Sequence, residues 1–206
     1  MTIRIPSSVL ACLAALPLVL LPACSHVPLA TMVKLADFDL LKTDPESLRI
    51  AVKYPDRIRI PDGGAKMMLA IRDKTTGKPL QQEDLAFQKL DSKAEKAELQ
   101  SELQAGYRLE IYRLPEEKVP AFRAFQAEIA SMSKAERDAI EGSMEIGVDG
   151  CLVSEEKPDR ILVSTFLKAD GLGGFVPLLR NVDLEEQMTE DGATGVEGLG
   201  RCESSG

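Results

Sequence analysis

Few side chains in this 206-residue sequence have the type and spacing that enzymatic chemistry requires. A serine followed three residues later by a lysine occurs twice, as Ser131 with Lys134 and as Ser154 with Lys157. On a helix this spacing places the amine one turn from the hydroxyl, where it can activate a serine nucleophile. The second pair falls in a segment that we expect to be a loop, and the partner motifs of serine–lysine enzymes are missing. We therefore interpret both pairs as surface residues.

The sequence also contains few residues that could support acid–base catalysis or metal binding. His26 is the only histidine, and it precedes the body of the chain, which removes Ser–His and Cys–His nucleophiles and histidine-based zinc sites from consideration. Asp37 with Asp39, and Glu155 with Glu156, are paired carboxylates. General acid–base catalysis needs a raised pKa in a cleft, so solvated surface is the simpler interpretation of each pair. The sequence predicts no catalytic residue, no metal site and no cofactor, and therefore a protein that is not an enzyme.

The clearest chemical signal lies near the N-terminus, in Leu21-Pro22-Ala23-Cys24. These residues end an apolar run, 9–23, that is preceded by Arg4. A transmembrane helix needs ~20 apolar residues, and this run is shorter and contains two prolines, each of which removes a helix hydrogen bond. A short basic region, an apolar run and small residues at its end are typical of a cleaved secretory signal peptide. A permanent N-terminal span is the alternative interpretation.

The same four residues resemble the lipobox of bacterial lipoproteins, in which an aliphatic residue, a small residue and a cysteine hold fixed positions. The resemblance implies cleavage before Cys24, which then carries acyl chains and becomes the new N-terminus. Ser25 is not the aspartate that retains such proteins in the inner membrane, so the resemblance implies the outer membrane, facing the periplasm. An ordinary signal peptide with a chance cysteine is the alternative. The resemblance covers the leader alone, and Pro22 departs from the usual small or hydroxyl residue at its position.

Two further cysteines belong to the mature chain. Because Cys12 leaves with the signal peptide and Cys24 takes lipid, Cys151 and Cys202 remain as an even pair in an oxidising compartment, where thiols normally become bridged. Alternation along 144–148 also directs Cys151 away from the core, to a face that a C-terminal tail can reach. We predict a disulfide between them, with two unrelated thiols as the alternative.

The net charge bears on the class of partner, and the composition indicates how the chain is divided into segments. The net charge is −8 and no basic cluster stands out, so nucleic acid is not a predicted partner. Glycine and acidic residues dominate the C-terminal end, which predicts a flexible tail. The predicted division is a signal peptide over 1–23, a lipidated tether over 24–42, a single β-rich domain over 43–188 and the acidic tail over 189–206.

Alternating apolar and polar residues recur along the body of the chain and predict half-buried strands. The clearest run is 48–54, whose even-numbered residues are all apolar or aromatic. Two pairs of such runs flank turn-forming stretches and are predicted to form hairpins. The first predicted hairpin joins 66–73 to 83–90, the second joins 143–150 to 160–168, and a further strand covers 107–114.

Two helices are predicted. Ser92 and Glu95 have the spacing of a capping box that opens a helix, and a longer helix begins near Pro120 and runs towards Gly142. An apolar stripe at helical spacing on the longer helix predicts that its central residues are buried against the sheet. That stripe consists of Phe122, Phe125, Ile129 and Met132. Together the elements predict an α+β fold, a mostly antiparallel β sheet or small sandwich with one packed amphipathic helix.

Three functions are compatible with these features. The leading hypothesis is a lipid-anchored periplasmic binding domain, an assembly or scaffold protein of the bacterial envelope with an unidentified envelope protein as partner and the membrane as its anchor. The second is a carrier of a hydrophobic ligand, in which Phe122, Phe125 and Ile129 line a groove between helix and sheet. The third is a periplasmic hydrolase that uses a carboxylate pair or a serine–lysine pair.

Overall fold

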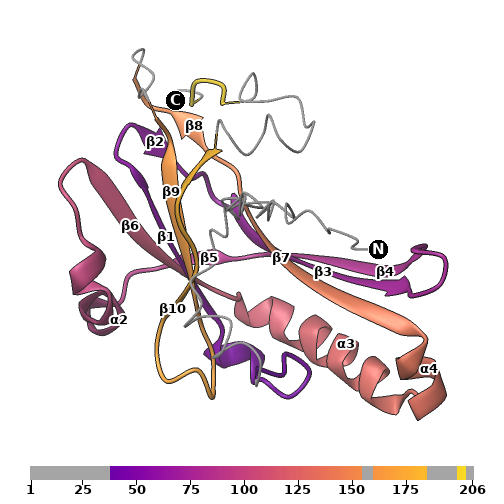
Figure 1. The fold of residues 1–206 in the computed structure, drawn as a ribbon. Coiled ribbons are helices and arrows are strands. Elements are labelled where there is room, and N and C mark those ends of the chain that lie inside the picture. Colours follow the sequence, from indigo (N-terminus) through magenta and orange to yellow (C-terminus); the bar gives the residue numbers. More distant parts are fainter. Residues whose placement is uncertain (1–37, 155–159, 185–198, 203–206) are drawn as a thin grey trace, which may run out of the picture.

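The chain alternates short strands with a few helices, and the structure is a computed structural model that describes residues 38–154, 160–184 and 199–202. Within them the predicted α+β fold is confirmed, because antiparallel sheets dominate and one longer helix packs against them (Figure 1). The largest sheet has the order β10-β9-β1-β6-β5 and consists of β1 (Arg49–Pro55), β5 (Gln88–Leu90), β6 (Tyr107–Arg113), β9 (Leu162–Lys168) and β10 (Val176–Asp183). The second sheet has the order β4-β3-β7 and consists of β3 (Ala65–Asp73), β4 (Pro79–Ala86) and β7 (Ile140–Val148), while β2 (Ile58–Arg59) pairs with β8 (Cys151–Leu152). The helical segments are η1 (Pro45–Ser47), α2 (Lys93–Glu98), η2 (Gln100–Glu102), η3 (Glu116–Lys118), α3 (Val119–Ser131) and α4 (Lys134–Asp138).

Strand β1 is the centre of the larger sheet and carries the alternation that the sequence predicted. Ile50, Val52 and Tyr54 belong to the main core, whereas Ala51 belongs to a smaller apolar cluster on the opposite face. Residues of β1 are buried on both faces because β1 has a strand on each side and packed elements above and below. Branched and aromatic side chains fit such a pleated, covered position.

The pairing of the first predicted hairpin is confirmed, although its second strand covers 79–86 and residues 88–90 belong to β5. The second predicted hairpin is wrong. Strands β3 and β4 pair antiparallel, with Met67 opposite Leu85. Strand β7, however, pairs with β3, whereas β9 lies between β1 and β10. Their burial explains the difference: β9 is buried on both faces and suits an interior position, while β7 exposes one face and suits an edge.

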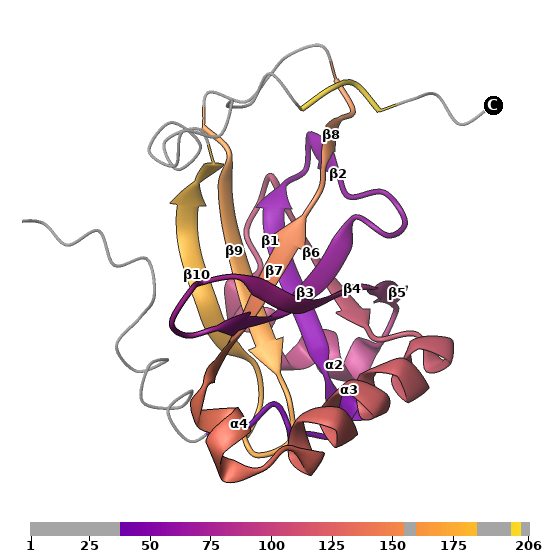
Figure 2. The same cartoon turned by 90° about the vertical axis from the view of Figure 1, so that its right-hand side faces the viewer.

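The two larger sheets face each other and are connected along one side only. Strand β4 leads into β5 through Phe87, which is 2 % exposed, so the sheets meet at these edges. On the opposite side the edge strands are β7 and β10, and no described strand pairs with the free edge of either. Figure 2 shows β5 on one side of the molecule and β10 on the other. The sandwich is therefore joined on one side and open on the other.

Helix α3 packs its apolar stripe against the sheets, as predicted, but it ends earlier than predicted. Phe125 and Ile129 are 7 % and 5 % exposed and belong to the main core, which confirms their predicted burial. The predicted continuation towards Gly142 is wrong, because α3 ends at Ser131 and Ser133 opens a new helix with its own capping box. The residues that follow α4 extend into β7.

Helix α2 and η2 cover the outer face of the larger sheet. Ser92 caps α2 by accepting the N–H of Glu95, but the Glu95 carboxylate pairs with Arg49 of β1 at 3.1 Å instead of completing a capping box. Leu99 is buried. Further ion pairs join this segment to β9 and β10, and they are Lys168 with Glu98 and Arg180 with Glu102. Apolar and charged contacts together hold the second layer on β1.

Candidate functional site

The two cysteines of the body lie together, as the sequence predicted. Cys151 and Cys202 form a disulfide with Cα atoms 4.9 Å apart. Leu152 donates its N–H to the Gly200 carbonyl at 3.0 Å, and Leu199 packs against the main core. Residues 199–202 are therefore held on the domain. For these residues the predicted flexibility of the tail over 189–206 is corrected. Cys24, the predicted lipidation site, lies outside the described residues.

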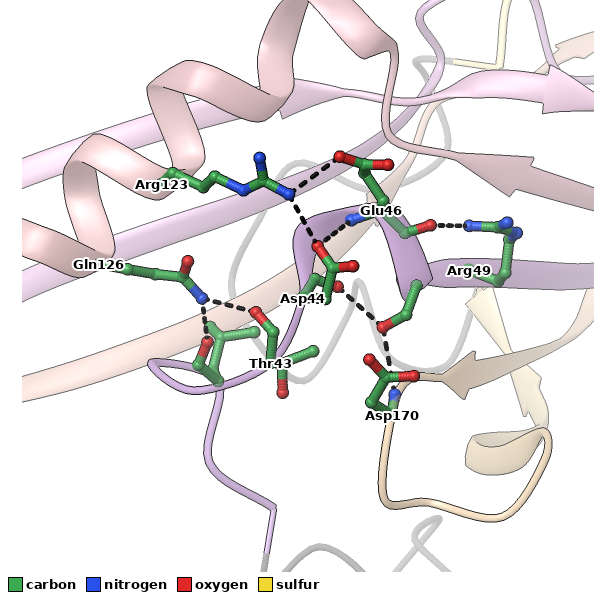
Figure 3. A network of polar contacts seen from close by, with 9 residues as sticks. Thr43, Asp44, Glu46, Arg49, Arg123, Gln126 and Asp170 are labelled. Carbon is green, nitrogen blue, oxygen red and sulfur yellow. Dashed lines mark hydrogen bonds and ion pairs between the residues drawn. The ribbon is translucent and has the colours of Figure 1, made fainter.

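A polar network fastens the start of the described chain to α3 (Figure 3). The Gln126 side chain donates to the carbonyls of Leu40 and Thr43, both at 2.8 Å. Arg123 contacts the carboxylates of Asp44 and Glu46 at 3.2 and 2.9 Å. Because these contacts begin at Leu40, packing against α3 already starts within the predicted tether, which was to end at residue 42.

A buried carboxylate on β6 forms a second polar cluster, which the sequence analysis missed. Glu110 is 9 % exposed and faces the interior, where it accepts a hydrogen bond from the Tyr112 hydroxyl at 2.7 Å and pairs with Lys89. Burial raises the pKa of Glu110, but the hydrogen bonds from Lys89, Tyr54 and Tyr112 outweigh it and hold that pKa below its ordinary value. Burial, followed by the Glu110 carboxylate, raises the pKa of both tyrosines.

This protonation pattern does not suit acid–base catalysis. A general base or acid works best with a pKa near the working pH, whereas the shifts keep Glu110 ionised and both tyrosines protonated at neutral pH. The cluster instead satisfies a buried charge with three donors, as buried charges require. The signal in the sequence was the parity of Glu110, which places it on the face of β6 opposite to Leu109 and Ile111.

Of the residue pairs that suggested chemistry, Ser131 with Lys134 is described in full, and it is not assembled. Ser131 donates its hydroxyl to the Glu128 carbonyl at 2.7 Å, while Lys134 pairs with Asp138 at 2.5 Å, because α3 ends between the serine and the lysine. Asp39 pairs with Lys42. Ser154 is described, but its partner Lys157 lies outside the described residues, as do Asp37, Glu155 and Glu156.

The described residues contain neither a metal-binding cluster nor a membrane-spanning helix. They contain no group of three or more histidine, cysteine, aspartate or glutamate side chains that could hold a metal ion. None of the helices in the described part of the chain is both long and apolar enough to cross a membrane.

A cavity of about 530 Å³ lies between the sheets on the open side of the sandwich. We call it the sheet cavity. Strands β1, β9 and β10 form one wall and β7 forms the other. Aliphatic side chains make up most of its lining, among them Val52, Val163, Leu179, Val182, Ile146 and Val148. The disulfide-linked tail contributes Leu199. Polar side chains are few, and one of them, Asp149, is already paired with Lys66 at 2.8 Å.

A second cavity, of about 390 Å³, lies between α3, β3 and β7, and we call it the helix cavity. Phe125 and Ile129 line it from α3, Met144 lines it from β7, and Phe38 and Leu40 line it from the first described residues. Two of the three residues proposed from the sequence as groove residues therefore border a cavity. The third, Phe122, is absent from its lining and is 1 % exposed, so it is plain core.

The chain matches no protein-family model, and no curated protein or solved structure is significantly similar to it. A function must therefore be argued from the geometry of the molecule.

Proposed function

We propose that this protein is a lipid-anchored binding domain of the bacterial envelope, held on the periplasmic face of the outer membrane through Cys24. It acts as an assembly or scaffold protein and not as an enzyme, and it binds an apolar part of another envelope component in the sheet cavity. The anchor part of the proposal is supported by the lipobox-like residues 21–24. The binding part is supported by the cavity.

The size and chemistry of the sheet cavity carry the proposal. Protein interiors are packed as densely as organic crystals, with few voids larger than a water molecule. The sheet cavity, of about 530 Å³, is much larger than such voids and is open towards solvent. Its aliphatic lining therefore faces water unless another group covers it. Covering apolar surface contributes roughly 25 cal/mol per Å² to binding, so the lining favours an apolar occupant.

Water interacts weakly with the sheet cavity, because the mostly aliphatic lining offers few hydrogen-bond partners. An apolar group from a ligand satisfies the lining residues. The volume also lies within the range of roughly 300–1,000 Å³ found for ligand pockets. The same observation supports the second candidate function, a carrier of a hydrophobic ligand, and the two differ in what occupies the cavity.

Native mass spectrometry of the protein extracted from membranes with mild detergent tests the proposal. Wild-type protein should carry a non-covalent mass that disappears on denaturation, whereas acyl chains on Cys24 should remain. Leu179→Trp places a large side chain in the sheet cavity and should remove the bound mass. Leu80→Trp is the matched control, because Leu80 lies on β4, is 56 % exposed and is absent from both cavities.

The identity of the bound mass distinguishes the candidates. A peptide or protein supports the assembly or scaffold function, and a lipid supports the carrier. Wild-type protein that carries nothing, or equal occupancy in Leu179→Trp and wild type, would show that the sheet cavity holds no native ligand in the extracted protein.

A further inference from the structure

Strand β7 presents a row of main-chain groups that no described strand pairs. β7 pairs with β3 over its whole length. Just beyond one end of this ladder Asp149 donates its N–H to the Gly64 carbonyl at 2.8 Å, and just beyond the other Lys74 donates to the Ala139 carbonyl at 2.9 Å. Because bonded and non-bonded pairs alternate in an antiparallel ladder, the odd-numbered residues of β7 point their polar groups to β3. The even-numbered residues of 140–148 point theirs to the free edge.

The residues with free main-chain groups are the same residues that line the cavities. Ile140 and Met144 line the helix cavity, while Ile146 and Val148 line the sheet cavity. A strand laid beside β7 in register would therefore form main-chain hydrogen bonds and direct every second side chain towards the two cavities. The free main-chain groups of β7 and the cavities that its side chains line therefore both favour an extended peptide as the ligand.

The free edge of β7 also lacks the features that protect the other sheet edges from pairing. Exposed edges are normally interrupted by proline, bulges or a short length. β5 has only three residues, β4 begins with Pro79 and has a shifted register with β3, and β10 contains Pro177 and two register shifts. β7 is nine residues long, contains no proline and pairs with β3 without a shift. It is the one regular, uninterrupted edge among these strands.

We propose that β7 is a docking strand for an extended peptide segment of a partner protein. The segment adds to the free edge of β7 on the open side of the sandwich, between β7 and β10, and places alternate apolar side chains in the helix cavity and the sheet cavity. This inference rests on the proposed function, because it names the class of ligand that the sheet cavity receives.

The face of β7 that points away from the cavities indicates which side chains the segment carries at its other positions. Glu141 and Glu145 are exposed there, so lysine or arginine at the intervening positions of an added strand would form opposite-charge cross-strand pairs. A second copy of β7 fits less well. In an antiparallel pair centred on Met144, Glu145 would lie diagonally opposite both glutamates of the other copy, and like charges at such positions repel. The expected segment alternates apolar and basic residues.

A fluorescent nonapeptide that alternates lysine with valine or isoleucine is a suitable probe. It is titrated, with anisotropy as the readout, into the mature lipidated protein in nanodiscs of zwitterionic lipid, with empty nanodiscs as the blank. Gly142→Pro removes one N–H from the free edge, and Gly142→Ala is the control, because a Cβ at this position meets no atom within 4 Å. The proline variant should bind about tenfold more weakly, since one hydrogen bond is lost and its acceptor is left unpaired. The alanine variant should stay within about twofold of wild type.

Residue-level amide exchange gives a signature that general binding to an apolar surface would not produce. The peptide should slow exchange at Gly142, Met144 and Ile146 and leave the odd-numbered amides of β7 unchanged, because β3 already protects those. Protection without alternation, or equal binding by Gly142→Pro and wild type, would overturn the proposal. A dimer of the protein that Gly142→Pro abolishes would overturn it in favour of a second copy.

Two combinations of results distinguish a failure of strand addition from a failure of the proposed function. If Leu179→Trp removes the native bound mass but the peptide does not bind, the sheet cavity remains a binding site and strand addition is wrong. If the peptide binds with the alternating protection but wild-type protein carries no bound mass, β7 docking stands and the occupancy proposed for the sheet cavity is wrong.

Discussion

Reduction of the disulfide between Cys151 and Cys202 should destabilise the protein by an amount that the structure allows us to estimate. The bond joins residues separated by 51 positions. In the chain-entropy model a loop of this length contributes about 4 kcal/mol by restricting the unfolded chain. The bond also holds residues 199–202 on β8, where Cys202 donates its N–H to the Leu152 carbonyl at 2.9 Å. Without the bond, ordering these residues would add to the entropy cost of folding.

Urea unfolding of the mature protein with and without dithiothreitol measures this difference. For an m-value of about 2 kcal/mol per molar, a loss of about 4 kcal/mol shifts the unfolding midpoint by roughly 2 M urea. The double variant Cys151→Ser/Cys202→Ser should unfold at the midpoint of the reduced protein and should not respond to the reductant. That variant controls for effects of dithiothreitol elsewhere in the chain.

Two results would refute the reasoning. A difference below about 1 kcal/mol between the oxidised and reduced proteins would show that the loop does not restrict the unfolded chain as the model requires. Labelling of both thiols in protein isolated from cells without reductant would show that the disulfide does not form in the compartment inferred from the leader.

Three further predictions test the anchor, the core and the buried carboxylate. Cys24→Ser should leave the chain uncleaved or release it from the membrane fraction, and unchanged partitioning and electrophoretic migration would contradict the lipobox interpretation. Phe125→Ala should cost ~2–5 kcal/mol in urea unfolding, as buried large-to-small substitutions do, whereas Leu103→Ala, at a side chain that is 60 % exposed, should cost less than about 0.5 kcal/mol; similar costs would place Phe125 outside the core. Because the folded-state pKa of Glu110 is lowered, its ionised form stabilises the fold above the unfolded-state pKa, and this stability is lost as the pH falls through the folded-state pKa. Glu110→Gln should therefore flatten the dependence of the free energy of unfolding on pH below about 5, and an unchanged acid profile would contradict the charged cluster.

Much of the local structure follows from the sequence because local patterns determine it. Alternation predicts β1, since a strand turns successive side chains to opposite faces. Asp44 caps η1 by accepting the N–H of Glu46, and Phe125 and Ile129 are buried because they share one face of a helix. The cysteine pair was predictable by counting, because only two cysteines were left once the leader was assigned.

The candidate site was not predictable from the sequence, because it arises from contacts between distant segments. Glu110 reads as an ordinary polar residue of a strand until Tyr54 and Lys89 are brought to it by β1 and β5. Phe125 and Ile129 look the same whether they face solid core or a cavity. The sheet cavity has no local signature at all, since its walls come from strands that are far apart in the sequence.

The sequence by itself determined the cysteine pairing, the faces of β1 and α3 and the fold class, because each depends on neighbouring residues or on counting, while the leader stays a prediction. Only the tertiary structure decided that β7 pairs with β3 and not with β9. Strand pairing is decided by which faces must be covered once all the elements compete for one core. The free edge of β7 and the cavities beside it follow from that competition, and so does the binding site proposed for this protein.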